Sequence, residues 1–521
     1  MNKDANKYRS FDGHGNNIDN PDWGQANSPL LRFSPIAYGD GINTLAQRGP
    51  HNPNPRVISN AVFQQSASVP SKNNLSDFIW AWGQFLDHEL DLTTTNNQEK
   101  ADIVVPDHDI VLCNLQLKGR EFSIPFSRSA AIEDTGTSPS NPRLHANVNS
   151  SYIDGSVVYG SDMERASALR TFDGTGRLKT STSESGELLP YNINDLENED
   201  NGDAQHDRFF LAGDVRANEH AVLTSIHTLF VREHNRLCLD IIACDPSLAG
   251  QEELIYQKAR KYVGGIIQAI TYEEFLPALL GQSAISPYTG YRPNVNAGIS
   301  HEFSTACYRL GHSMLSSELM LGGNGNTIQL RDMFFKPYFV RLHGIEAILM
   351  GLTLQRMQEV DAQIVEDVRS FLFGPPNQVK GQLLDLAALN IQRGRDHGLA
   401  GYNAFREAFG LNRLKDFSEI TSDTNVANIL CDLYKDIDYV DPWVGALAED
   451  QVEGSNVGPL IFAVLKNQFE RARDGDRFWY ANDPELTIEQ RVEIESTRLS
   501  DVIRRNTDLE DIPDNVFIAQ I

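Results

Sequence analysis

Apolar residues recur with a helical period from Ser76 to the end of the chain, whereas the strict alternation typical of strands is scarce. We therefore predict a mainly α fold with few short strands. The helical segments lie near residues 76–92, 219–243, 252–280, 303–316, 343–372 and 382–392, with further helices expected at 400–409, 424–435, 459–473 and 487–505.

The first 70 residues lack this periodicity. They are rich in Asn, Pro, Gly and Ser, yet they also carry aromatic residues such as Tyr8 and Trp23. We therefore predict an irregular arm that lies over a core, not a disordered tail. A polar stretch at 173–207 is predicted to be surface loop. Because we find neither an internal repeat nor a linker, we treat 71–521 as one domain and 1–70 as its arm.

Composition narrows the choice of partners. The chain has 71 acidic and 45 basic residues, and its formal net charge of -26 disfavours nucleic acid and anionic membranes. Apolar runs such as Leu460–Leu465 are far shorter than the ~20 residues needed to cross a bilayer, so we expect no membrane span. The N-terminus shows no apolar stretch of a cleavable secretory signal. The sequence does not decide the cellular compartment, although it favours an extracellular location over the cytoplasm.

Cysteine usage does not indicate a disulfide framework. The five cysteines are few for 521 residues, odd in number and never spaced as CxxC. We interpret them as small buried residues in preference to disulfides or a metal site. They are Cys113, Cys238, Cys244, Cys307 and Cys431.

A first polar cluster falls in WGQFLDHELDLT, residues 82–93. On a helix, Gln84, Asp87, His88 and Asp91 stand at i, i+3, i+4 and i+7 and share one face. A solvated face with an incidental histidine is one interpretation. The large apolar residues around this face favour a buried polar stripe, which must find partners or carry chemistry. This segment alone leaves the two interpretations about even.

A second cluster, Arg216, Glu219 and His220, stands where the helix near 219–243 begins. Glu219 suits the helix dipole, so simple capping explains it. An arginine and a glutamate ahead of a buried helix also suit a site that stabilises developing negative charge. The segment is therefore compatible with either role.

Two further segments carry possible metal chemistry. ACYRLGHSML places His312 three residues after Arg309, and LAALNIQRGRDHG ends an apolar helix with Asn390 and the polar run 393–397. Basic residues that answer a helix dipole account for that run. In the functional alternative, Asn390 hydrogen-bonds a metal-bound histidine, which fixes the ring and raises its basicity.

The segment SSYIDGSVVYGS presents the oxygens of Ser150, Asp154 and Ser156 in alternation with backbone carbonyls. Hard oxygen ligands of this kind suit calcium. By itself the segment is more simply a turn between two elements.

These five segments, in this order and with these gaps, resemble the animal-type haem peroxidases of the peroxidase-cyclooxygenase superfamily. The resemblance covers essentially the whole chain, from YRSFDGHGNN through ARKYVGGIIQAITYEEFLP and RDGDRFWY to about Arg505. The compact length is most similar to the short bacterial members. The resemblance implies a helical haem peroxidase fold, and no single motif among the five carries it alone.

Residue roles follow from this resemblance position by position. It implies that His88 is the distal histidine, that Gln84 binds halide and water, and that Arg216 is the distal arginine. The residues expected to bind the cofactor are His312 as the proximal iron ligand, Asn390 as its hydrogen-bond partner, Arg309, and the carboxylates Asp87 and Glu219, which match two ester links to haem methyl groups. The implied cofactor is a haem b derivative, ester-linked through both carboxylates.

The chain also departs from the family pattern. His220 stands where one member has a methionine that bonds a haem vinyl group, so we expect this third link to be absent. One calcium ion is implied, and its matching ligands are Glu89, Ser150, Tyr152, Asp154 and Ser156. Glu89 is one methylene longer than the family's aspartate, which puts the geometry of this site in doubt.

The implied function is reduction of hydrogen peroxide coupled to oxidation of halides, thiocyanate or phenolic donors, by a monomer. A fatty-acid dioxygenase of the same superfamily is one alternative. It would need a tyrosine three residues before the proximal histidine, where this chain has Arg309, with Tyr308 one residue earlier. A haem-free structural or adhesion protein is a second alternative. It should have lost His88, Arg216 or His312, and the chain keeps all three.

Overall fold

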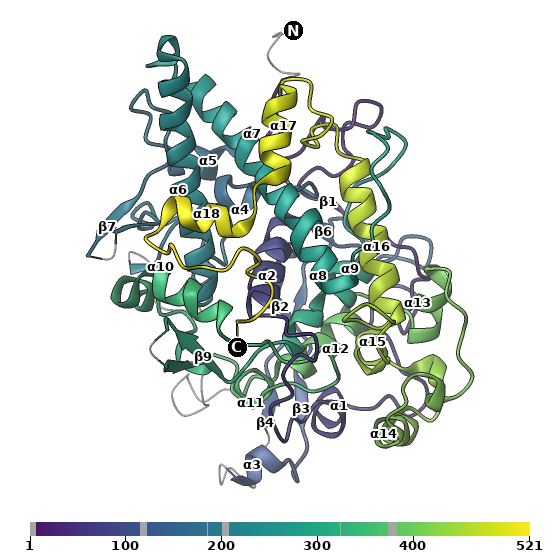
Figure 1. Cartoon of the computed structure of the whole chain (residues 1–521). Coiled ribbons are helices and arrows are strands. Elements are labelled where there is room, and N and C mark those ends of the chain that lie inside the picture. Colours follow the sequence, from purple (N-terminus) through teal and green to yellow (C-terminus); the bar gives the residue numbers. More distant parts are fainter. Residues whose placement is uncertain are drawn as a thin grey trace.

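The structure is a computed structural model that describes residues 7–114, 122–184, 186–200, 208–323, 325–373 and 383–520. Helices dominate it, which confirms the mainly α prediction (Figure 1). The α-helices are α1 (Pro55–Val62), α2 (Phe78–Leu90), α3 (Ile110–Asn114), α4 (Ser156–Tyr159), α5 (Met163–Leu169), α6 (Ala221–Cys244), α7 (Glu252–Ile270), α8 (Leu276–Leu280), α9 (His301–Ser304), α10 (Tyr338–Thr353), α11 (Glu366–Arg369), α12 (Leu386–Asp396), α13 (Tyr402–Ala408), α14 (Thr424–Tyr434), α15 (Pro442–Ala448), α16 (Pro459–Asp474), α17 (Ile488–Ser496) and α18 (Leu499–Asn506).

The described strands pair only in twos, always antiparallel, so sheets contribute little to the core. The pairs are β1 (Ser28–Pro29) with β6 (Ala146–Asn147), β2 (Thr95–Lys100) with β5 (Ser127–Ser129), β3 (Ile103–Val105) with β4 (Phe122–Ile124), β7 (Ser181–Ser183) with β8 (Gly186–Leu188), and β9 (Glu318–Leu321) with β10 (Asn326–Gln329). Shorter helical turns are η2 (Pro246–Leu248), the π-helix η3 (Thr271–Phe275), and the 3-10 helices η4 (Cys307–Ser313), η5 (Leu330–Asp332), η6 (Phe417–Glu419) and η7 (Ile437–Tyr439).

Three of the predicted helices are interrupted. The segment near 303–316 is α9 followed by the 3-10 helix η4, because the backbone leaves helical geometry at Ala306. The segment near 343–372 is α10 and α11, and Gly344 breaks α10 with a positive φ of 71° that glycine adopts without strain. The segment 487–505 is two helices, since Thr497 and Arg498 are extended.

The sequence predicts an irregular arm, but part of the arm is helical. Helix α1 forms within it, with Pro55 at its first turn and the Asn54 side chain accepting hydrogen bonds from two backbone N–H groups. In the predicted loop at 173–207, β7 and β8 form a short hairpin, and residues 185 and 201–207 lie outside the described part.

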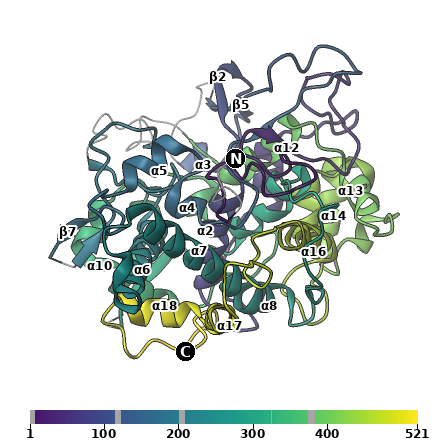
Figure 2. The same cartoon turned by 90° about the horizontal axis from the view of Figure 1, so that it is seen from above.

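Helix α2 lies at the centre of the molecule in both views (Figures 1 and 2). Its apolar face is buried, and the ring of Phe85 stacks on Phe230 of α6 at 5.4 Å. One continuous apolar core extends from Phe11 in the arm to Phe517 near the C-terminus. Because α2 is packed on several sides, its polar side chains are held where water has little access.

Two further predictions from the sequence concern membrane-spanning helices and the state of the cysteines. Among the described residues, no helix combines the length and apolar character that a membrane crossing requires. All five cysteines are free thiols, and Cys238 and Cys307 are buried as expected, whereas Cys244 and Cys431 are exposed.

Candidate active site

A cavity of about 240 Å³ lies between α2 and the 3-10 helix η4. It brings together seven side chains that the sequence pointed to, although they come from positions 84 to 312. These are Gln84, Asp87, His88, Arg216, Glu219, Arg309 and His312. Apolar side chains such as Phe275 and Phe334 complete the walls. A mostly apolar cavity with a few convergent polar groups is the usual form of a cofactor site.

On one side of the cavity, Asp214 pairs with Arg216 and lies beside His88. The Nδ1 atom of His88 lies 3.5 Å from Oδ1 of Asp214. The guanidinium of Arg216 donates to both oxygens of the same carboxylate, from Nε at 2.9 Å and from Nη2 at 2.8 Å. Nη2 also donates to the carbonyl of Asp91, at 2.8 Å. The arginine is therefore held rigidly against the end of α2.

The charges on this side are set by burial and by that ion pair. Burial, with a further contribution from Arg216, lowers the pKa of His88 well below its ordinary value. Burial by itself would raise the pKa of Asp214, but the charge of Arg216 and the hydrogen bonds that it donates, together with His88, lower this pKa overall. His88 is therefore neutral and Arg216 charged at physiological pH, which leaves one proton acceptor and one fixed cation at the cavity.

Two carboxyl groups in the cavity resist ionisation. Burial, with the neighbouring Asp91, raises the pKa of Asp87 to about 7. Burial, with the neighbouring Glu199, raises the pKa of Glu219 to about 8. Such shifts mark positions where the fold holds a carboxyl group without enough compensating charge, a frequent property of functional sites.

Gln84 is oriented by His220. The Nδ1 atom of His220 accepts the N–H of Leu223 at 3.2 Å, as the cap of α6. Its proton is therefore on Nε2, which donates to Oε1 of Gln84 at 2.7 Å. This bond fixes the amide so that its NH₂ group is directed away from His220, and Gln84 in turn hydrogen-bonds Glu219.

On the opposite side of the cavity, His312 of η4 meets Asn390 of α12. Nδ1 of His312 lies 2.6 Å from Nδ2 of Asn390, and Nη1 of Arg309 donates to Oδ1 of the same amide at 3.0 Å. Arg309 therefore decides which end of the amide faces the histidine. Burial lowers the pKa of His312 to about 3, so its ring is neutral.

The loop beside α2 gathers the oxygens expected for calcium, with one difference from the sequence-based expectation. Oγ of Ser150 lies 2.8 Å from Oδ2 of Asp154, and Oγ of Ser156 lies 2.8 Å from the main-chain oxygen of Glu89. The Glu89 carboxylate accepts the N–H groups of residues 154, 155 and 157, and the hydroxyl of Ser156 at 3.2 Å. The longer glutamate therefore bonds the start of α4 as well as one oxygen of the cluster.

Sequence reasoning missed Asp214, the residue that pairs with Arg216 beside His88. Its position two residues before Arg216 was the only local signal. It also missed Asn149, whose Nδ2 donates to the main-chain oxygen of His88 at 2.7 Å. Both contacts join segments far apart in the sequence, so no periodicity reports them.

Comparison with known proteins shows which family the chain belongs to. The family model described as animal haem peroxidase matches residues 8–517. The chain belongs to the animal haem peroxidase family. It is accordingly a haem-binding oxidoreductase of the peroxidase class, and its relatives carry peroxidase names.

Among the relatives, peroxinectin A of Dictyostelium discoideum is 35% identical over 526 residues, which cover 98% of this chain and 96% of that protein. Lactoperoxidase of Mesocricetus auratus is 34% identical over 98% of this chain and 78% of its own length. Thyroid peroxidase of Mus musculus is 35% identical over 98% of this chain, which spans only 61% of that protein.

Solved structures share the fold. Peroxidase A of Dictyostelium discoideum superposes with a TM-score of 0.89 at 34% identity, covering 98% of this chain and 99% of that chain. A fatty acid alpha-dioxygenase of Oryza sativa superposes with a TM-score of 0.79 at 22% identity, covering 99% and 88%. At that identity the second likeness concerns the fold alone.

Proposed function

We propose that the cavity holds a haem b derivative between His312 and His88, and that the chain uses it to reduce hydrogen peroxide to water while oxidising bromide, iodide, thiocyanate or a phenol. One observation carries this proposal. A single cavity is faced by a histidine and an arginine on one side and by a histidine backed by an amide on the other. When bound, the haem supplies the redox chemistry, while the protein positions and tunes it.

His88 is the proton carrier in this proposal. Its ring is neutral, because burial lowers its pKa, and its Nδ1 is directed at Asp214. Nε2, on the opposite edge of the ring, is then the atom that takes a proton from one oxygen of hydrogen peroxide. The same atom returns the proton to the oxygen that leaves as water, so His88 acts first as base and then as acid.

Arg216 has the complementary task of stabilising charge. Asp214 and the carbonyl of Asp91 hold its guanidinium in place before any substrate arrives. A cation that does not need to move is well suited to stabilise the negative charge that develops on the departing oxygen.

His312 is our proposed iron ligand through Nε2, which requires its proton to be on Nδ1. In the structure the amide nitrogen of Asn390 faces Nδ1, because Arg309 donates to the amide oxygen. A half-turn of this amide would present Oδ1 to the Nδ1 proton. We propose that the amide adopts this second orientation when the cofactor is bound and that Arg309 then gives up its hydrogen bond to the amide, which would strengthen His312 as a ligand.

Asp87 and Glu219 are the proposed sites of two ester bonds to the haem. Both carboxyls line the cavity, and their raised pKa values favour the protonated acid near neutral pH. Asp87 and Glu219 would hold the haem through these bonds, and hydrogen peroxide would be the oxidant that forming each C–O bond requires. A haem absorption that stays with the protein through acidic organic extraction is the expected result.

Gln84 is the proposed contact for a small anion. His220 donates to the amide oxygen and Glu219 accepts one N–H of the amide, so the second N–H is the part left to meet a halide or thiocyanate. We expect chloride to be the poorest halide, because His220 replaces the methionine whose link favours a very oxidising haem. Turnover of chloride equal to that of bromide would contradict this expectation.

We further propose one calcium ion at the loop beside α2. The oxygens of Ser150, Asp154 and Ser156 and the main-chain oxygen of Glu89 gather there, and the carbonyl of Tyr152 completes the set implied by the family. Among the described residues, the buried carboxylates of Glu89 and Asp154 form no ion pair. Burial raises the pKa of both carboxyl groups, because it disfavours their charged forms. A bound cation would stabilise these charged forms.

Steady-state turnover tests the proposed function as a whole. The haem-loaded protein should oxidise bromide, iodide, thiocyanate or a phenol at the expense of hydrogen peroxide and show a haem Soret band. Failure of every donor in haem-replete protein would refute the proposal. Tyr308 lines the cavity, so oxygen uptake with a fatty acid should be measured in parallel, since rapid uptake would favour the dioxygenase alternative.

A further inference from the structure

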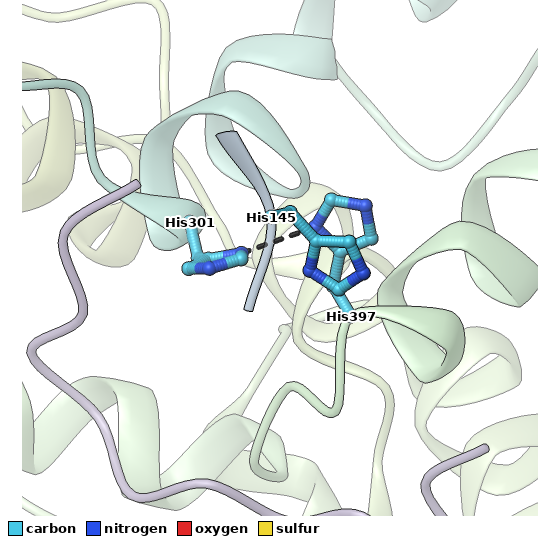
Figure 3. Close-up of side chains that lie close together, drawn as sticks. All are labelled: His145, His301 and His397. Atoms are coloured by element: carbon cyan, nitrogen blue, oxygen red, sulfur yellow. Dashed lines mark hydrogen bonds between the residues drawn. The ribbon is translucent and has the colours of Figure 1, made fainter. Parts of the chain in front are cut away.

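Three histidines meet in the interior outside the cavity. His145 precedes β6, His301 begins α9 and His397 follows the end of α12. They are 0%, 1% and 1% exposed, and one ligand nitrogen from each ring lies within 4.8 Å of the others. Figure 3 shows the ring of His145 face to face with that of His397, and the edge of His301 directed at them.

The described part of the protein leaves one member of this cluster, His145, without partners for its ring nitrogens. Neither nitrogen of His145 has a hydrogen-bond partner in the described part of the chain. Nδ1 of His301 lies 3.0 Å from Nδ1 of His397, where at most one of the two can carry a proton.

One segment of the arm holds the backbones of all three histidines. The N–H of Leu30 donates to the carbonyl of His145 at 2.9 Å, and the N–H of His301 donates to the carbonyl of Leu31 at 2.9 Å. Nη2 of Arg32 donates to the carbonyl of His397 at 2.6 Å. The backbone segments that carry the three rings are therefore already fixed, as a preorganised site requires.

Nearby side chains complete the surroundings of a metal site. Oγ of Ser129 lies 2.7 Å from Nε2 of His397, and such an outer partner directs the other ring nitrogen toward a metal. Of the surrounding arginines, Arg128 and Arg393 share the single carboxylate of Asp396, and Arg143 pairs with Glu99. These carboxylates offset part of the positive charge around the cluster.

We propose that His145, His301 and His397 bind one zinc or copper ion, each through one ring nitrogen. Neutral imidazole is a preferred ligand of both metals, and three imidazoles with an oxygen form a common coordination set. Oγ1 of Thr305, 3.2 Å from Nδ1 of His397, is close enough to the cluster to support that fourth position. Because a metal lies in the plane of each ring that binds it, the stacked pair must open by rotation of one ring.

This ion would link the two segments of the chain that carry His312 and Asn390. His301 stands eleven residues before His312 in the chain, and His397 ends the helix that carries Asn390. The metal would therefore fix the positions of η4 and α12 relative to each other without contacting the cofactor. The inference does not depend on which donor the enzyme oxidises.

Metal content of the haem-loaded full chain tests the proposal. Protein from cultures supplied with zinc or with copper is dialysed against a weak chelator, and zinc and copper are measured relative to haem iron. We expect about one zinc or one copper per chain in one of the two preparations. Metal absent from both preparations would overturn the proposal.

A pair of variants shows whether the metal belongs to this cluster. His145→Gln should lose most of the zinc or copper, whereas His343→Gln, at an exposed histidine, should retain it. Equal metal in the parent and in His145→Gln would count against the site. Since a buried variant can fail to fold, X-ray absorption at the zinc or copper edge of the parent provides a second measure. Imidazole nitrogens at about 2.0 Å are expected, and a shell without imidazole would refute the assignment.

Discussion

The two sides of the cavity are built in different ways. On the side of His88, one α-helix carries Gln84, Asp87 and His88 within little more than a turn. On the side of His312, a 3-10 helix carries the histidine, while its partner Asn390 lies 78 residues further along the chain. The difference teaches that helical periodicity arranges the proton-transfer groups, whereas the packing of distant segments arranges the candidate iron ligand. Each side can be disturbed separately.

The largest effect is expected from removing the proton carrier. His88→Leu keeps the apolar packing of α2 but removes the acid and base, so the rate of reaction with hydrogen peroxide should fall by roughly 10²- to 10⁴-fold. Stopped-flow spectroscopy of the haem bands measures this rate. His343→Gln is the control and should react like the parent. An unchanged rate in His88→Leu would show that the side of α2 does not carry the proton.

A smaller effect is expected on the opposite side. Asn390→Ala removes the partner of His312, and we expect the peroxide reaction to slow by about 10- to 100-fold, as for other outer-shell partners of metal ligands. The reduction potential of the haem iron should rise, because the histidine becomes less basic. Asn390→Asp should shift the potential the opposite way. If neither variant changes the potential, the amide has only a packing role.

Calcium removal tests whether the proton-transfer side depends on its neighbouring loop. Asn149 ties that loop to the carbonyl of His88, so loss of the ion should loosen the end of α2. We expect chelation to lower the unfolding temperature by roughly several degrees and to slow the peroxide reaction. Calcium should restore both. An unfolding temperature that is the same with chelator and with calcium would contradict the proposed ion.

The smallest effect concerns the first turn of the same helix. Asp77 is 1% exposed, its oxygens have no hydrogen-bond partner among the described residues, and burial raises its pKa to about 8. Because the folded pKa exceeds the unfolded value near 3.9, the favourable contribution of the protonated acid is lost as pH rises from about 4 through 8. Asp77→Asn should therefore be more stable than the parent at pH 9, by about 1 kcal/mol or more.

Denaturant unfolding of Asp77→Asn and the parent at pH 5 and pH 9 measures this difference. The gap between the two proteins should widen with pH. Parallel stabilities at both values would mean that the Asp77 carboxylate is accommodated without cost.

Prediction from the sequence succeeded where the signal was local. Gln84, Asp87 and His88 share one face of α2, as the sequence predicts. The apolar residues between them determine which face of the helix is buried. The helix expected over 303–316 was only partly right, since the backbone turns at Ala306 and continues as a 3-10 helix. Glu89 could be placed beside His88 from the sequence, but not the direction in which its carboxylate reaches.

By itself, the sequence determined the helical class of the fold, the polar stripe of α2 and the family to which its ordered motifs are similar. Each of these depends on spacing along the chain, which the sequence states directly. Only the tertiary structure decided that Asp214 pairs with Arg216 beside His88, that Arg309 orients Asn390, and that His145, His301 and His397 share one interior cluster. Such contacts arise when helices from distant parts of the chain bury their apolar faces together, and no local period encodes them.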